Sequence, residues 1–211
     1  MVYQVARIVR DVRIAIDENT TSDRLISEED IDTLALEEIA RSKIEEAARS
    51  VLVVAPVHLI DGGLPLGDAV HWRDQGCGWI LLPDDFMRLL VFRMSDWERP
   101  VYNAITEMDP VYKQQFSRYK GLRGNPQKPV VAVTRRAEGF ALELFSCKDK
   151  NATIEQGMYL PYPRIDRDEG IDIPKRCYRS VIYEAASLAL ATLGRGDLSS
   201  IMSELSKQLL V

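Results

Sequence analysis

The amino-acid sequence predicts an α+β protein in which helices from both ends of the chain form a bundle that carries a central β-rich insertion. Apolar residues recur at helical spacing near both termini, whereas the middle third has short apolar runs separated by Gly and Pro. This order differs from the regular βαβ alternation of nucleotide-binding folds. We expect a helical core made of residues 1–60 and 173–211, and a β-rich insertion made of residues 61–172.

Two helices are predicted in the N-terminal region. The first covers residues 3–18, where one face is apolar and the other carries arginines and an aspartate. The second is expected to begin at Ser27, a hydroxyl residue followed three positions later by an acid, and to continue to about Ala55, just before Pro56. At 1.5 Å per residue it would be roughly 40 Å long.

The middle of the chain has the turn residues and short apolar runs that are typical of a β-rich region. Glycine-bearing turns separate short apolar runs, and Pro110 follows Asp109 in the way that opens a helix. The expected elements are a hairpin of residues 69–72 and 78–82, a strand at 89–94, a short helix from 110 to about 119, and a hairpin of residues 130–134 and 140–146.

The C-terminal region is predicted to be helical again. A helix should follow Ile173-Pro174, run to about Leu193 and end at the glycines of Gly194-Arg195-Gly196. Asp197 is then expected to cap a last helix with an apolar stripe.

Composition restricts the classes of function. The net charge is −5 and the pI is about 5.2, so the chain has no overall excess of cations for coating nucleic acid. Three widely spaced cysteines predict neither a disulfide framework nor a zinc site. No secretion signal or membrane-spanning run is recognisable, so we expect synthesis in a cytoplasm and no membrane partner.

The sequence contains no recognisable catalytic motif, and we predict no catalytic residue, metal ligand or cofactor. One alternative is an enzyme with a diffuse carboxylate site at Asp84 and Asp85 or at Asp166 and Asp168, because paired carboxylates can hold a divalent cation. Another is a small nucleic-acid-binding module that uses the basic and aromatic residues between Lys113 and Arg123.

Protein contact surfaces are the more favoured interpretation. Trp, Tyr and Arg dominate the energetics of such interfaces. Two stretches combine these residue types, around Trp97 and after Pro110. The interface residues predicted from them are Trp97, Arg99, Tyr102, Lys113, Arg118 and Arg123.

Three stretches of the sequence also carry a family resemblance. They are Ile80-Leu81-Leu82-Pro83-Asp84-Asp85-Phe86-Met87-Arg88-Leu89, then Trp97-Glu98-Arg99-Pro100-Val101, and the ending from Ile173-Pro174 through Ala185-Ala186 to the break at Gly194–Asp197. In these stretches and in its organisation the chain resembles the head-to-tail adaptor proteins (tail tubular or ring proteins) of short-tailed bacteriophages, including crAss-like phages. Residues 61–79 and 147–172 have no counterpart in the resemblance.

The resemblance implies a structural virion protein rather than an enzyme. Such a protein forms a homo-oligomeric ring, usually of about twelve copies, which docks beneath the portal protein at the head-tail junction of the virion. The ring extends the DNA channel, holds tail or nozzle proteins, and lets genomic DNA pass without sequence-specific binding. An acidic chain suits a channel to which DNA should not adhere.

Overall fold

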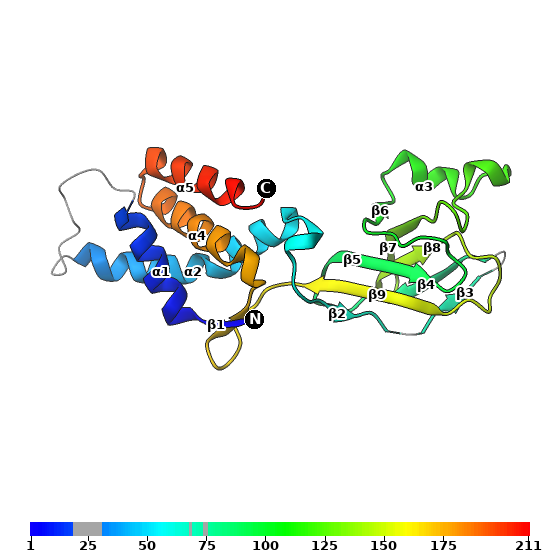
Figure 1. The fold of residues 1–211 in the computed structure, drawn as a ribbon, viewed down its shortest axis with the longest axis horizontal. Helices are drawn as coiled ribbons and strands as arrows, with labels where there is room; N and C mark the ends of the chain where they lie inside the picture. The colour runs from blue at the N-terminus through cyan, green and yellow to red at the C-terminus, as the bar shows by residue number, and fades with distance from the viewer. Residues whose placement is uncertain (19–30, 68, 74–75) are drawn as a thin grey trace. The chain divides into compact units, whose positions relative to one another are not determined.

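The computed structural model describes residues 1–18, 31–67, 69–73 and 76–211, and it contains both helices and strands, as an α+β protein does (Figure 1). About 39% of the chain is helical and 25% is strand. Two compact units share the chain. The first, here called the helical unit, comprises residues 1–62 and 163–211, and the second, the β unit, comprises residues 63–162.

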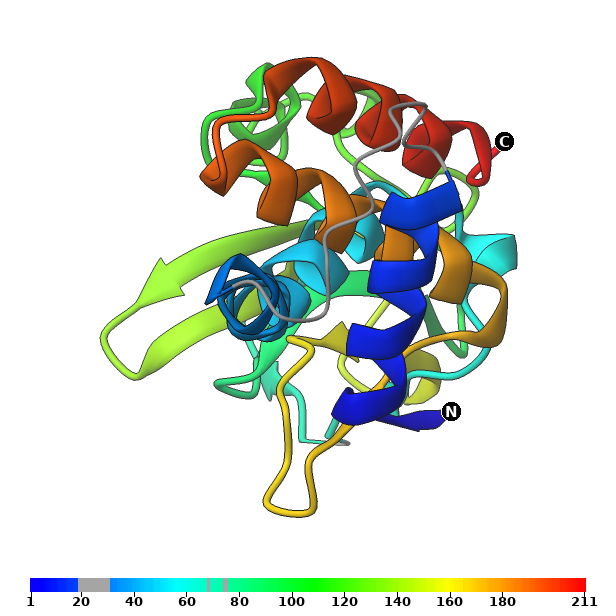
Figure 2. The same ribbon diagram turned by 90° about the vertical axis from the view of Figure 1, so that its left-hand side faces the viewer.

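Four α-helices build most of the helical unit (Figure 2). They are α1 (Val5–Glu18), α2 (Ile31–Val54), α4 (Tyr178–Thr192) and α5 (Gly196–Gln208), with short 3-10 helices at Val57–Leu59 and Lys175–Cys177. The predicted extents of these helices are largely confirmed, although the proposed cap at Ser27 lies outside the described residues. Asp197 lies inside the first turn of α5, and Arg195 occupies the capping position expected for Asp197.

Helix α4 occupies the centre of the helical unit and contacts α1, α2 and α5. Its inward face is rich in small residues, and three of them, Ala185, Ala186 and Ala189, are fully buried. Two serine pairs join α4 to α5: Ser180 Oγ donates to the carbonyl of Ser206 (2.8 Å), and Ser187 Oγ donates to that of Ser199 (2.8 Å). Small side chains let neighbouring helices approach α4 closely, and the paired hydroxyls satisfy buried polar groups.

A two-stranded sheet also belongs to the helical unit. Strand β1 (Val2–Gln4) pairs antiparallel with β10 (Gly170–Asp172), so residues 3 and 4, predicted as the start of a helix, are extended instead. Residues 163–172 likewise belong to this unit, although they were predicted to lie in the β-rich insertion. Their attachments explain the difference: Ile165 N donates to Glu45 (2.7 Å), and the Arg41 guanidinium binds both carboxylate oxygens of Glu169 (2.5 and 3.0 Å).

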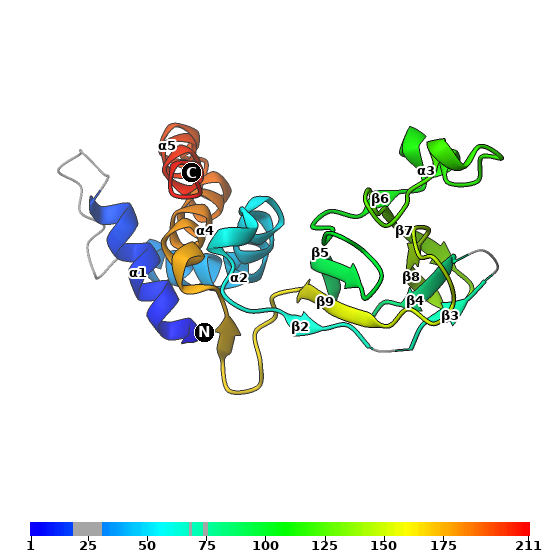
Figure 3. The same ribbon diagram turned by 45° about the vertical axis from the view of Figure 1, so that its right-hand side comes forward.

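The β unit consists of two sheets (Figure 3). The strands are β2 (Leu64–Pro65), β3 (His71–Trp72), β4 (Gly78–Leu81), β5 (Phe86–Met94), β6 (Ile105–Thr106), β7 (Val131–Arg136), β8 (Gly139–Leu144) and β9 (Ile154–Pro161). One sheet has the order β3-β4-β8-β7-β6 and the other β2-β9-β5. The two predicted hairpins are confirmed as β3–β4 and β7–β8, while β9 lies in a segment where no strand was predicted.

A shared apolar core joins the two sheets of the β unit. Ile80 and Leu142 enter it from the larger sheet, and Leu89 and Phe92 enter it from the smaller one. Helix α3 (Pro110–Gln114) lies between β6 and β7 in the chain and is shorter than predicted. As predicted, Pro110 opens it, and the carboxylate of Asp109 caps it by accepting from Val111 N (2.8 Å).

The close packing around α4 leads to a stability prediction. We expect Ala185→Leu to lower the free energy of unfolding by about 1–3 kcal/mol, because the added methylenes have no space between α4 and its neighbours. Ala191→Leu, at an exposed position of the same helix, should change it by less than about 0.5 kcal/mol. Urea denaturation followed by circular dichroism measures both, and equal midpoints for the two variants would contradict the tight packing.

Candidate interaction surfaces

The predicted interface residues are all in the β unit, but the structure does not give them equal access to a partner. Trp97 is 2% exposed and lies in the core, where its ring meets Phe92 edge to face at 5.6 Å. The prediction that Trp97 is an interface residue is therefore wrong: its large apolar area is used between the two sheets. Arg99 is exposed and Tyr102 is 52% exposed, so both remain accessible.

The other three predicted residues lie on one segment, from Met108 to Lys128, which contains α3 and the loop after it. Lys113 and Arg118 are exposed, and Arg123 is half-buried. Large apolar side chains are exposed among them: Met108 (93%), Val111 (38%), Phe116 (58%), Tyr119 (72%) and Leu122 (55%). We call this segment the α3 surface.

A mixture of apolar and cationic side chains distinguishes the α3 surface. Residues 110–137 contain seven Lys and Arg and not one Asp or Glu, although the whole chain is acidic. This absence of acids is a signal in the sequence that none of the predictions used. The segment also borders a hollow of about 400 Å³, lined by Gln115, Arg123 and Lys128 among others.

A buried carboxylate attaches the α3 surface to the larger sheet. Glu143 on β8 is 4% exposed, and it accepts hydrogen bonds from the Tyr112 hydroxyl (2.9 Å) and from the Arg136 guanidinium. Arg73 lies 3.5 Å away, and Arg136 stacks over the ring of Trp79. A buried charge is tolerated when cations and hydrogen bonds compensate it, as they do here. Burial of Tyr112 and the neighbouring Glu143 raise the pKa of that tyrosine to about 12.

Aromatic packing and one amide complete the attachment. The rings of Tyr112, Phe116 and Phe145 contact one another edge to face, with centroids 5.2 to 5.9 Å apart. Gln115 is buried, donates to the carbonyl of Val111 (2.9 Å), and accepts from Gly124 N (2.8 Å). The loop after α3 is thereby bound to α3 itself, and its exposed side chains have a fixed support.

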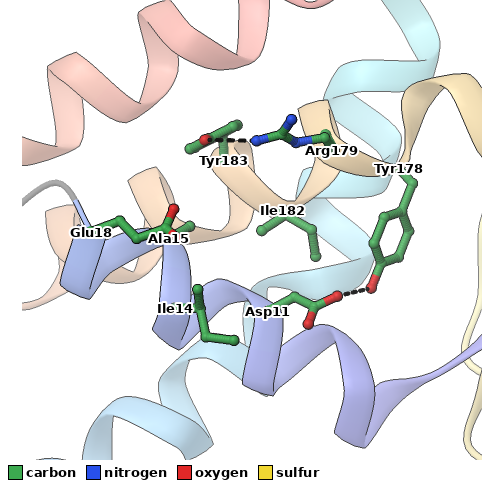
Figure 4. Close-up of a pocket in the computed structure, with 8 residues that line it drawn as sticks. All are labelled: Asp11, Ile14, Ala15, Glu18, Tyr178, Arg179, Ile182 and Tyr183. Atoms are coloured by element: carbon green, nitrogen blue, oxygen red, sulfur yellow. Dashed lines mark hydrogen bonds between the residues drawn. The ribbon is translucent and has the colours of Figure 1, made fainter.

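A second candidate surface lies in the helical unit, between α1 and α4 (Figure 4). This groove has a volume of about 290 Å³, and it is lined by Asp11, Ile14, Ala15, Glu18, Tyr178, Arg179, Ile182 and Tyr183. We call it the α1–α4 groove. Ile14 is 42% exposed at its edge, and Ile182 is 6% exposed. The Tyr178 hydroxyl donates to Asp11 (2.7 Å), and burial together with Asp11 raises the pKa of Tyr178 above its ordinary value.

The carboxylates of the enzyme alternative have structural contacts. In the β unit, Asp85 accepts from the Tyr159 hydroxyl (2.9 Å). In the helical unit, Asp166 accepts from Asp168 N (2.9 Å) and Gly170 N (2.7 Å) and so closes the turn before β10. Within the described ranges, no three His, Cys, Asp or Glu side chains are grouped so as to hold a metal ion.

Comparisons with known proteins add no family or relative. No protein-family model matches the sequence, and no curated protein shows significant similarity to it. For the part of the chain that the structure describes, no helix is long and apolar enough to cross a bilayer.

The contact between Tyr112 and Glu143 leads to a prediction with a defined pH dependence. Tyr112→Phe should lower the free energy of unfolding by about 1 kcal/mol at pH 8, since a hydrogen bond to a buried carboxylate is lost. The pKa of Tyr112 is about 12 when folded and about 10 when unfolded, so this stabilisation should be present below pH 10 and be lost as the pH rises towards 12.

Denaturation of wild type and variant from pH 8 to 11 measures this difference. Tyr119→Phe, at the 72% exposed ring, is the matched control and should equal wild type throughout. A difference between wild type and Tyr112→Phe that is constant up to pH 11 would contradict the assignment of the hydrogen bond.

Proposed function

We propose that this chain is a head-to-tail adaptor of a tailed bacteriophage, a structural subunit that assembles into a ring beneath the portal protein. In this proposal the terminal helices form the adaptor bundle, and the β unit is an insertion that the bundle carries. The ring stands at the head-tail junction of the virion, extends the DNA channel and holds tail or nozzle proteins. The protein is made in the host cytoplasm.

The observation that carries the proposal is the exposed apolar area of the α3 surface. A subunit that acts alone gains nothing from leaving Met108, Phe116, Tyr119 and Leu122 in water, whereas a subunit of an assembly buries such side chains against its neighbours. Assemblies of this kind bury on the order of 2,000 Å² or more at each contact. The resemblance of residues 80–89 and 97–101 to phage adaptor proteins favours a phage adaptor ring as this assembly.

Charge distribution also supports the proposal. Residues 1–62 and 163–211 hold 14 Lys and Arg against 20 Asp and Glu, whereas residues 63–162 hold 13 against 12. An acidic part beside DNA repels the phosphates, so the DNA moves through the channel without being retained. The more basic part is then free for protein contacts.

Co-assembly with the portal protein tests this function. We expect the purified chain to form rings at high concentration, or to form them on portal complexes from the same genome, with about twelve copies per ring. Negative-stain imaging and native mass spectrometry measure this, with an unrelated acidic protein of similar mass as control. A chain that stays monomeric and does not bind portal at high micromolar concentration would sink the proposal.

A further inference from the structure

The α3 surface and the α1–α4 groove have complementary properties. The α3 surface presents exposed aromatic and aliphatic side chains between cations. The α1–α4 groove is hollow and apolar along its floor, with acids on its α1 side. One belongs to the β unit and the other to the helical unit, so two copies of the chain can each contribute one of them.

The groove fits an aromatic side chain. Ile14, Ala15 and Ile182 supply apolar contact, and the rings of Tyr178 and Tyr183 flank them (Figure 4). The hollow has a volume of about 290 Å³, which is large enough for one aromatic ring. An aromatic side chain that packs there would bury about 150–250 Å² of surface. Tyr119 is the most exposed ring of the α3 surface, at 72%.

The charges fit as well. Asp11 and Glu18 are seven residues apart on α1, about two helical turns or 10 Å, so an acid stands near each end of the groove. Lys113 and Arg118, both exposed, flank the aromatic side chains of the α3 surface. Opposite charges around an apolar centre steer two surfaces together and fix their register. Arg179 lines the groove and donates to the Tyr183 hydroxyl (3.4 Å), and Arg7 lies 3.9 Å from Asp11. Glu18 is therefore the acid that the contact between copies would use.

We propose that the α3 surface of one copy docks into the α1–α4 groove of the next copy. Tyr119 enters the apolar part of the groove, and Arg118 pairs with Glu18 at its end. The inference rests on the proposed function in that it specifies the contact between neighbouring subunits of the ring. Each copy uses a different surface on either side, so the contact is heterologous and propagates from copy to copy.

A second copy explains the α3 surface better than a nucleic acid does. Phosphates would satisfy Lys113 and Arg118, but they offer nothing to Met108 and Leu122, which are also exposed. The groove supplies both an apolar floor and carboxylates. A DNA contact is nevertheless one result that the experiment below can return.

Two variants that each remove one side of the contact provide the test. The first, Arg118→Glu with Tyr119→Ala, alters only the α3 surface. The second, Ile14→Lys with Glu18→Lys, alters only the groove, at two exposed positions of α1. Each variant alone should need at least tenfold more protein than wild type to assemble. An equal mixture should form heterodimers and stop there, because the unaltered groove of the first variant accepts the unaltered α3 surface of the second.

Light scattering after size exclusion, with native mass spectrometry, counts the copies. Lys148→Glu on the β unit and Glu204→Lys on α5 are matched charge reversals at exposed positions outside both surfaces, and both should assemble as wild type does. Circular dichroism confirms that all variants are folded. A chain that combines Arg118→Glu with Glu18→Lys should regain part of the lost assembly, since the pair is restored with its charges exchanged.

The outcomes separate this inference from the proposed function. If wild type forms rings and both variants do so equally well, the contact is wrong while the adaptor function stands. If both variants fail alone and their mixture gives no dimer, the two surfaces are not partners. If the first variant forms rings but loses binding to a DNA duplex at low salt, the α3 surface is a DNA contact instead. A wild type that never self-associates, with or without portal, overturns both proposals.

Discussion

The burial of Glu143 is the constraint on which the candidate interaction surface depends. Moving a carboxylate out of water costs several kcal/mol unless cations and hydrogen-bond donors replace the lost hydration. Here Arg136 and Arg73 supply the positive charge and Tyr112 supplies a hydroxyl. Because Tyr112 belongs to α3, its hydrogen bond to the buried carboxylate also holds α3 against the larger sheet. Together with the packing of Phe116 on Phe145 and the hydrogen bond from Gly124 N to Gln115, that attachment holds the segment that follows.

A fixed support changes what the exposed side chains can do. Flexible apolar residues in a loop would lose much conformational entropy when they bind a partner. In the α3 surface this entropy is partly lost before any partner arrives, since Phe116 packs on Tyr112 and Phe145 while Gln115 binds Gly124. Rings that are held in place and still exposed are the type of residue that contributes most to protein interfaces. The buried polar contacts of Tyr112 and Gln115 therefore hold a segment whose apolar side chains are exposed.

Sequence patterns were sufficient for the helices and hairpins but not for the long-range pairings. Helix α1 and the hairpin β7–β8 depend on local periodicity and turns, which the sequence displays. Strands β1 and β10 are three residues each and exist only because they pair across almost the whole chain, so no local pattern marks them. The prediction for Trp97 was limited in the same way. A tryptophan is common both in interfaces and in cores, and only the packing of the two sheets places Trp97 in the core. The acid-free run 110–137 could have been predicted from the sequence. The α1–α4 groove could not, because it forms only where two helices distant in the sequence pack together.

The distribution of charge also restricts which assemblies the chain can form. If two α3 surfaces met each other across a twofold axis, two segments with five Lys and Arg against one Asp would face one another, and like charges at close range are strongly unfavourable. Two α1–α4 grooves meeting in the same way would oppose Asp11 and Glu18 with their own copies and leave both hollows unfilled. Only the unlike pairing combines opposite charges with an occupied groove. An assembly built by unlike pairing presents one free surface of each kind until rotation closes it, and the rotation between neighbouring copies sets the number of copies. Surface chemistry at two places is in this way enough to favour a contact between unlike surfaces over a contact between like ones.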